Sequence, residues 1–194
     1  RPEIETETAT SGGVVAEDKR SIFGYPHLLL GAVCIFLYVG VEVMAGDAIG
    51  VYGKSEGISL GTAKFFGSFT MCAMLIGYIV GIVCIPKYLS QQTALRVSAV
   101  LGVLFSTLAF LTTGYTAITF IALLGLANAL MWPAIWPLAI DGLGKHLKTG
   151  AAMLVMGIAG AAVIPPIYGV LKDNPHIGNK LAYFYLLTPS GIAA

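Results

Sequence analysis

The sequence predicts an all-α membrane protein, a polytopic bundle of helices that cross the bilayer. Of its 194 residues, 57% are hydrophobic and only 11% are charged, a ratio that no soluble domain needs. Apolar runs long enough to span a bilayer recur along the chain. The formal net charge of +1 does not point to a nucleic-acid partner. These observations favour a multi-pass membrane protein.

Residues 1–21 predict a solvated linker on the cytoplasmic side. The segment is polar, contains small residues and shows no apolar periodicity. Lys19 and Arg20 immediately precede the first hydrophobic run, as positive charges often do on the cytoplasmic side of a membrane. Residues 22–194 are then expected to form one transmembrane domain, with its last helix truncated at Ala194.

Five complete spans and the start of a sixth are predicted after the linker. The first contains Glu42 and Asp47 and is broken by Gly40 and Gly46, whereas the second carries Lys64 near its mouth, where a long side chain can snorkel. The connections are short, so consecutive helices should be antiparallel neighbours. The predicted spans cover about residues 25–52, 60–85, 93–112, 117–140 and 149–171, and the sixth begins near residue 179.

The positive charges of the connections predict the orientation. One set of alternate ends carries Lys19, Arg20, Lys87, Arg96, Lys145 and Lys148. The other set carries Lys54, Lys64, Lys172 and Lys180. The first set is modestly richer, so the amino end and the loop around Lys145 are predicted to lie in the cytoplasm.

The end of the fourth span is the first candidate site. Asn128, Trp132 and Trp136 recur every four positions, so they are expected to share one helical face. An amide and two indoles inside an apolar helix form a wall suited to a polar ligand, although packing and interfacial anchoring are the alternative. Pro133 and Pro137 each remove a backbone hydrogen bond and should bend the helix.

Glu42 and Asp47 are the second candidate site, because a carboxylate inside a membrane helix is costly and usually faces a cavity or a partner. Five residues apart on an α-helix, they lie roughly 140° apart around the axis and about 7.5 Å along it, unless Gly46 unwinds the helix. Proton binding and hydrogen bonding to a polar substrate are the functional interpretations. The alternatives are a structural acid bonded to a neighbouring helix for Glu42 and an ordinary wet position for Asp47.

No catalytic or metal-binding motif is present, so neither an enzyme nor a cofactor or metal is expected. No histidine pair, cysteine pair or acidic cluster has ligand spacing, and there is no phosphate-binding glycine loop or nucleophile elbow. The cysteines all lie inside apolar runs and are predicted to be buried free thiols: Cys34, Cys72 and Cys84. In the fifth span, Gly157, Gly160 and the Pro165–Pro166 pair predict close packing and a bend, which fits a gating joint or a small-residue interface.

These stretches together resemble the sugar-transporting branch of the major facilitator superfamily, the group of fucose–proton symporters and glucose/galactose transporters. The resemblance rests on residues 38–43 (YVGVEV), 128–144 (NALMWPAIWPLAIDGLG), 150–160 (GAAMLVMGIAG) and 163–169 (VIPPIYG). With their spacing they cover nearly all of the chain after residue 21. The chain departs from these relatives at Gly77-Tyr78, where they often have Gly-Arg.

The resemblance implies that the chain is the carboxyl-terminal half of a two-half transporter, preceded by the end of the central cytoplasmic loop. Its spans would be helices seven to twelve of the fold, of which the seventh, eighth, tenth and eleventh line the cavity. The implied partners are a monosaccharide such as glucose, galactose or fucose, a proton or alternatively a sodium ion, the lipid bilayer and the missing amino-terminal six-helix half. The implied location is the inner (plasma) membrane.

The resulting function is secondary active transport of a hexose by alternating access. Asn128, Trp132, Trp136 and Glu42 are the predicted substrate-binding residues, and Glu42 and Asp47 are the candidates for ion coupling. Two alternatives remain: a symporter of another polar solute, and a non-transporting membrane sensor or subunit with the same fold.

Overall fold

The computed structural model describes residues 22–85 and 87–187, and these are helical with short connections and no strand. Within these ranges, five helical segments are long and apolar enough to cross a membrane: Pro26–Ser55, Leu60–Cys84, Gln91–Leu111, Gly114–Ile140 and Gly144–Lys172. They match the predicted spans to within a few residues, so the multi-pass helical class is confirmed. The predicted linker over residues 1–21 and the end of the last helix lie outside the described residues.

Several spans are interrupted helices. The first consists of α1 (Pro26–Val43), the π-helical turn η2 (Met44–Ala48) and α2 (Ile49–Ser55). The second consists of α3 (Leu60–Ala63) and α4 (Phe66–Cys84), and the third of α5 (Gln91–Leu111). The fourth consists of α6 (Gly114–Asn128) and α7 (Met131–Ile140). The fifth joins α8 (Leu147–Met156) to α9 (Gly160–Lys172) through the 3₁₀ turn η4 (Gly157–Ala159), and α10 (Gly178–Leu187) follows.

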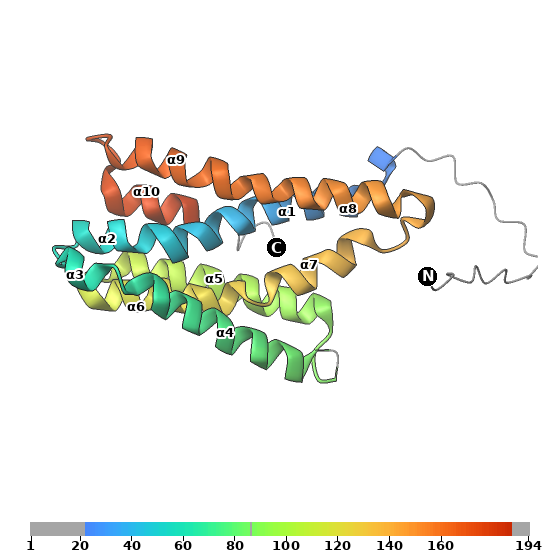
Figure 1. Ribbon diagram of the computed structural model, residues 1–194, viewed down its shortest axis with the longest axis horizontal. Helices are drawn as coiled ribbons and strands as arrows, with labels where there is room; N and C mark the ends of the chain where they lie inside the picture. Colours follow the sequence, from blue (N-terminus) through green and yellow to red (C-terminus); the bar gives the residue numbers. More distant parts are fainter. Residues whose placement is uncertain (1–21, 86, 188–194) are drawn as a thin grey trace, which may run out of the picture.

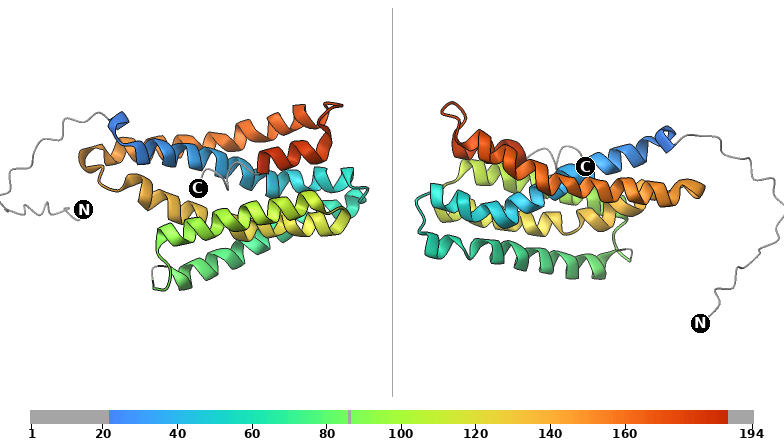
Figure 2. Two further views of the ribbon diagram at one scale, coloured as in Figure 1. Left: turned by 180° about the vertical axis from the view of Figure 1, so that it is seen from behind. Right: turned by 45° about the horizontal axis from the view of Figure 1, so that its top comes forward.

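Consecutive spans run antiparallel, as the short connections predict (Figures 1 and 2). The beginning of α1 and the α4–α5 and α7–α8 connections lie at one end of the bundle. The α2–α3, α5–α6 and α9–α10 connections lie at the other end. Spans distant in sequence also pack together, because α1 contacts α7, α8 and α9, and α6 contacts α4.

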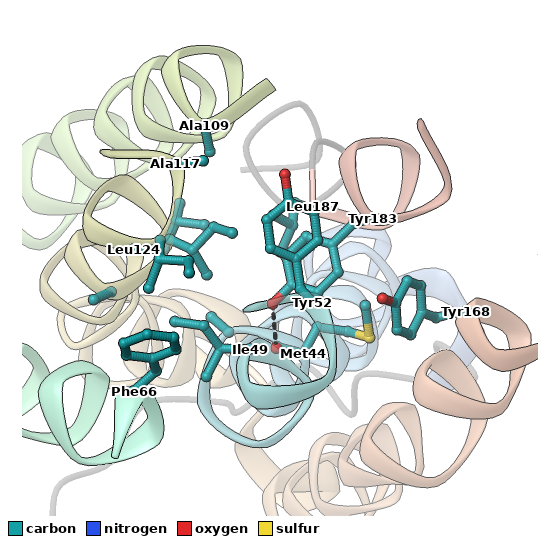
Figure 3. Close-up of a cluster of buried hydrophobic side chains, with 14 of the residues drawn as sticks. Met44, Ile49, Tyr52, Phe66, Ala109, Ala117, Leu124, Tyr168, Tyr183 and Leu187 are labelled. Carbon is teal, nitrogen blue, oxygen red and sulfur yellow. Dashed lines mark hydrogen bonds between the residues drawn. The ribbon is translucent and has the colours of Figure 1, made fainter. Parts of the chain in front are cut away.

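Two apolar clusters fill the bundle, one toward each end. The cluster toward the α2–α3 end is shown in Figure 3 and has Tyr183 of α10 among its buried side chains. The ring of Tyr183 lies 4.7 Å from that of Tyr52 and 5.2 Å from that of Tyr168 between centroids. The second cluster, toward the α7–α8 end, includes Leu28, Ile35, Tyr38, Met131, Ile135 and Leu154.

The π-helical turn η2 is held by side chains from two other spans. A π-helical turn bonds residues five apart, so the α-helical hydrogen-bond pattern is interrupted there. The hydroxyl of Tyr183 donates a hydrogen bond to the carbonyl oxygen of Met44 at 2.6 Å (Figure 3), and that of Thr70 donates to Ala45 at 2.9 Å. The predicted break at Gly46 is thus a wide turn, whereas Gly40 lies inside α1.

The fourth span breaks where its first proline requires. The helix stops between α6 and α7 at Ala129–Leu130, four residues before Pro133. Proline has no N–H to donate to the carbonyl of residue 129, and its ring crowds that carbonyl. The second proline, Pro137, lies inside α7 without ending it. The predicted bend is therefore confirmed at Pro133. At Pro137 the helix continues without interruption.

Glycines of the fifth span bring it against the first span. A Cβ atom on Gly157 would lie 3.0 Å from the carbonyl oxygen of Ala32, and one on Gly160 would overlap the carbonyl oxygen of Phe36. These contacts confirm the small-residue interface. The alternative, a gating joint, stays a prediction, although the helix does change to 3₁₀ geometry at Gly157–Ala159.

We expect Gly160→Ala to destabilise the protein, because its methyl group would enter the backbone of α1. Overpacking typically costs about 1–3 kcal/mol, and a backbone carbonyl cannot rotate away as a side chain can. Thermal unfolding of the full-length protein in detergent measures the effect. Gly169→Ala is the matched control, since a Cβ there in the same helix meets nothing within 4 Å. Equal losses from both variants would contradict the close approach.

Candidate functional site

Glu42 lies near the middle of the first span, and the hydroxyl of Tyr38 lies close to its carboxyl group. It is half-buried and stands one helical turn after Tyr38, which is 1% exposed. The Tyr38 hydroxyl is within hydrogen-bonding reach of the Glu42 carboxyl and of Tyr78 on α4. The three side chains therefore form a polar cluster that joins the first and second spans. This arrangement suits both the structural and the functional interpretation of Glu42.

Asp47 is exposed and lies in the π-helical turn, where it lines a cavity of about 610 Å³. The cavity lies between the first and second spans, and Lys64 and Ser68 face Asp47 across it. The wide turn adds one residue to the helical repeat, so it reduces the angle between Glu42 and Asp47 below the 140° expected for an α-helix. The local unwinding at Gly46, which the sequence left open, is therefore present as a π-helical turn.

Asn128 is the last residue of α6 and is 2% exposed. Its side-chain nitrogen finds no hydrogen-bond partner among the described residues. A buried N–H group left unpaired costs about 1–3 kcal/mol, so such a group in a folded protein needs an explanation. An amide that is kept at membrane depth without a protein partner is suited to a ligand or to a partner segment.

Trp132 and Trp136 are half-buried and stacked on each other, with ring centroids 5.4 Å apart and planes inclined by 27°. They pack against the apolar cluster near the α7–α8 end. Because α6 ends at Asn128 and α7 begins at Met131, the helix that should carry all three side chains on one face is interrupted. The two indoles share a face of α7, and Asn128 belongs to the preceding helix.

Sequence reasoning missed four contributors to these polar regions: Tyr38, Tyr78, Lys64 and Ser68. Tyr38 had a usable signal, since it stands four residues before Glu42 and therefore on the same helical face. Tyr78 had none, because its approach to Glu42 depends on how α4 packs on α1. Lys64, expected to snorkel at the mouth of its span, lines the cavity that contains Asp47.

Polar contacts also tie the spans together at both ends of the bundle. At the α7–α8 end, the His27 ring donates a hydrogen bond from Nε2 to the carbonyl oxygen of Asp141 at 2.9 Å. At the opposite end, the Glu56 carboxylate accepts one from the backbone N–H of Gly114 at 2.7 Å. Through this hydrogen bond, His27 joins the first and fourth spans. No group of three or more potential metal ligands occurs within the described residues.

Comparison with known proteins finds sugar transporters. No protein-family model matches the chain. The glucose/galactose transporter of Brucella abortus is 34% identical over 170 residues, which cover 84% of this chain and 40% of that protein. The putative glucose/galactose transporter of Helicobacter pylori is 28% identical over 180 residues (87% and 44%), and the L-fucose-proton symporter of Escherichia coli is 24% identical over 149 residues (76% and 34%).

The chain spans about two fifths of the length of the first of these relatives, and the match lies in their carboxyl-terminal portion. Among solved structures, the major facilitator superfamily transporter FucP in the outward conformation superposes with a TM-score of 0.79 at 21% identity, over 86% of this chain and 40% of FucP. A second crystal structure of the Escherichia coli fucose:proton symporter gives a TM-score of 0.75. This likeness shows the fold, which is the six-helix carboxyl-terminal half of a major facilitator. The relatives are transporters and not enzymes.

We expect Tyr38→Phe to change the hydrogen bonding of Glu42, because it removes the hydroxyl that reaches the carboxyl group. Infrared spectroscopy of the full-length protein should show a shifted Glu42 carboxyl band, which is assigned by its loss in Glu42→Gln. Leaving a buried polar group unpaired should also lower stability by about 1–3 kcal/mol. Tyr88→Phe, in an exposed connection, is the control. An unshifted band would mean that the tyrosine does not contact the acid.

Proposed function

Because this chain is a homologue of bacterial glucose/galactose transporters and fucose–proton symporters and has the major facilitator fold, we propose that it is the carboxyl-terminal half of a monosaccharide transporter. The observation that carries the substrate class is the 34% identity to a glucose/galactose transporter over 84% of the chain. Transport proceeds by alternating access, in which two halves rock around a central site.

The remaining half is an amino-terminal bundle of six helices. The coverage of only 40% of the first relative supports this division. Residues 1–21 are the end of the cytoplasmic loop between the halves, and residues 22–194 belong to the transmembrane half itself. The complete protein is a multi-pass protein of the inner (plasma) membrane.

The sugar binds near the bilayer midplane, between the halves. The unpaired amide nitrogen of Asn128 donates to a sugar hydroxyl, and the Glu42 carboxyl group accepts from another. The stacked indoles of Trp132 and Trp136 cover an apolar C–H face of the ring. This combination of hydrogen-bonding groups and an aromatic surface suits a hexose, whose hydroxyls lie around an otherwise apolar ring.

Proton coupling uses the carboxyl groups of the first span. A charged carboxylate is costly to enclose when the halves close over it, and a bound proton removes that charge. Glu42 is the first candidate because it is half-buried near the middle of its span. Asp47 is the second, as an exposed acid on the way to it. A sodium ion is the alternative coupling ion.

Uptake of radiolabelled hexose into vesicles that carry the full-length protein tests this function, with and without an imposed proton gradient. Uptake that rises with the gradient is the expected result. Uptake that ignores the proton gradient would leave a facilitator or a sodium symporter. No uptake of glucose, galactose or fucose would mean that the substrate assignment is wrong, and a panel of other polar solutes, or binding without uptake, would then identify the alternative.

Asn128→Ala and Trp132→Ala should each sharply reduce hexose uptake at normal expression. Loss of a hydrogen bond or of a stacking face worth about 1–3 kcal/mol corresponds to about a five- to 150-fold loss in affinity. Ile82→Ala is the control, since this side chain is 79% exposed on α4. Wild-type uptake from both site variants would refute the assignment.

Glu42→Gln, which mimics the protonated acid, should remove the response of uptake to the proton gradient. Counterflow, which needs no gradient, should fall far less than gradient-driven uptake, because the glutamine oxygen still accepts a hydrogen bond from the sugar but cannot take up a proton. Asp47→Asn is measured in parallel. Retention of a full gradient response in both variants would assign coupling to residues outside this chain.

A further inference from the structure

The cavity beside Asp47 is built by the close approach of two spans. Three of its lining residues are glycines, Gly46, Gly50 and Gly67. A Cβ on Gly67 would lie 2.6 Å from the carbonyl oxygen of Gly46, and one on Gly50 would lie 3.3 Å from that of Ala63. The backbones of the first and second spans therefore meet here, and their side chains diverge around a hollow of about 610 Å³. This volume lies within the range of small-molecule sites.

The cavity carries hydrogen-bonding groups of opposite charge. Asp47 supplies a carboxylate, Lys64 an ammonium group and Ser68 a hydroxyl, while Met71 adds apolar surface. Among the described residues, no salt bridge joins Asp47 to Lys64, whose ammonium group lies 5.0 Å from the centroid of the Phe65 ring, so the two charges do not neutralise each other by direct contact. The charges cancel, which favours a neutral molecule with several hydroxyl groups over an anion or a cation.

The cavity and the Glu42 cluster both lie between the first and second spans, at different depths. Asp47 lies five residues after Glu42, further toward the α2–α3 end. On the second span, Lys64 and Ser68 stand four residues apart, and Tyr78 follows ten residues after Ser68. Tyr78 reaches the Glu42 cluster, and Lys64 and Ser68 line the cavity. Polar groups therefore occur near the α2–α3 end and again near the middle of the bundle. The positive charges of the loops predict that the α2–α3 end lies outside the cell.

We propose that this cavity is a second binding site for the transported monosaccharide, occupied on its way between the outer solution and the central site. Asp47 accepts hydrogen bonds from neighbouring hydroxyls, and Lys64 and Ser68 donate to others. The proposal rests on the proposed function for the identity of the sugar. The site itself is defined by the cavity and its three polar groups.

Cys72, which the sequence predicted to be buried, is instead exposed and lines the cavity, so it reports on the site directly. In the full-length protein, Cys34→Ala and Cys84→Ala, with removal of any cysteines outside this chain, leave it as the only thiol. A membrane-impermeant charged maleimide is applied from outside, and the labelling rate is measured with and without hexose on ice. At a hexose concentration of about twice its Kd, simple occupancy predicts about threefold slower labelling.

Two comparisons make the test specific. Ala73→Cys with Cys72→Ser places the thiol one residue away, in the apolar hollow against α6, so hexose should not change its labelling. Asp47→Asn and Lys64→Met should each abolish the protection of Cys72, because each removes a ligand group from the cavity.

The outcomes separate this proposal from the transport proposal. Protection of Cys72 by hexose that is lost in Asp47→Asn supports the second site, even if uptake itself fails. An unreactive Cys72, protection that persists in both Asp47→Asn and Lys64→Met, or protection by glycine and not by hexose would overturn it. Gradient-driven uptake with an unprotected Cys72 would leave a transporter without this site.

Discussion

The bilayer requires every backbone polar group to be paired, and the first span meets this requirement at a point where its helix is irregular. The wide turn η2 carries a glycine and a carboxylate at membrane depth. The hydroxyls of Thr70 and Tyr183 donate to two of its carbonyls, which secures the turn from α4 and from α10. Unpaired carbonyls in hydrocarbon would each cost several kcal/mol. The polar face of the first span therefore depends on these two contacts.

The same turn also sets the relative positions of Glu42 and Asp47. A regular α-helix would direct Glu42 and Asp47 to well-separated faces, whereas the wide turn brings them closer in angle. Glu42 then meets Tyr38 and Tyr78, and Asp47 opens into the cavity with Lys64 and Ser68. Both polar regions lie between the first and second spans. Glycines in the fifth span pack closely against the backbone of α1, and this apolar contact supports the first span away from its polar groups.

The sequence predicted the fold well and the site in part. Hydropathy located the spans, since crossing a bilayer needs a long apolar run. Pro133 predicted a bend, because a missing N–H has a local effect. Asn128, Trp132 and Trp136 were expected on one face, yet the break at Ala129–Leu130 assigns Asn128 to a different helix from the indoles. The fourfold spacing assumed a continuous helix, but Pro133 cannot bond the carbonyl of residue 129, so the helix breaks between Asn128 and Trp132.

By itself, the sequence determined the helical membrane class, the order of the spans and the relationship to sugar transporters. These follow from composition, local periodicity and motifs, which act along the chain. Only the tertiary structure decided that Tyr78 approaches Glu42, that Lys64 and Ser68 share a cavity with Asp47, and that the nitrogen of Asn128 is left without a partner in the described part of the chain. These contacts depend on how the separate spans are rotated and on how closely they approach each other. Glycine contacts and side-chain hydrogen bonds between helices set both.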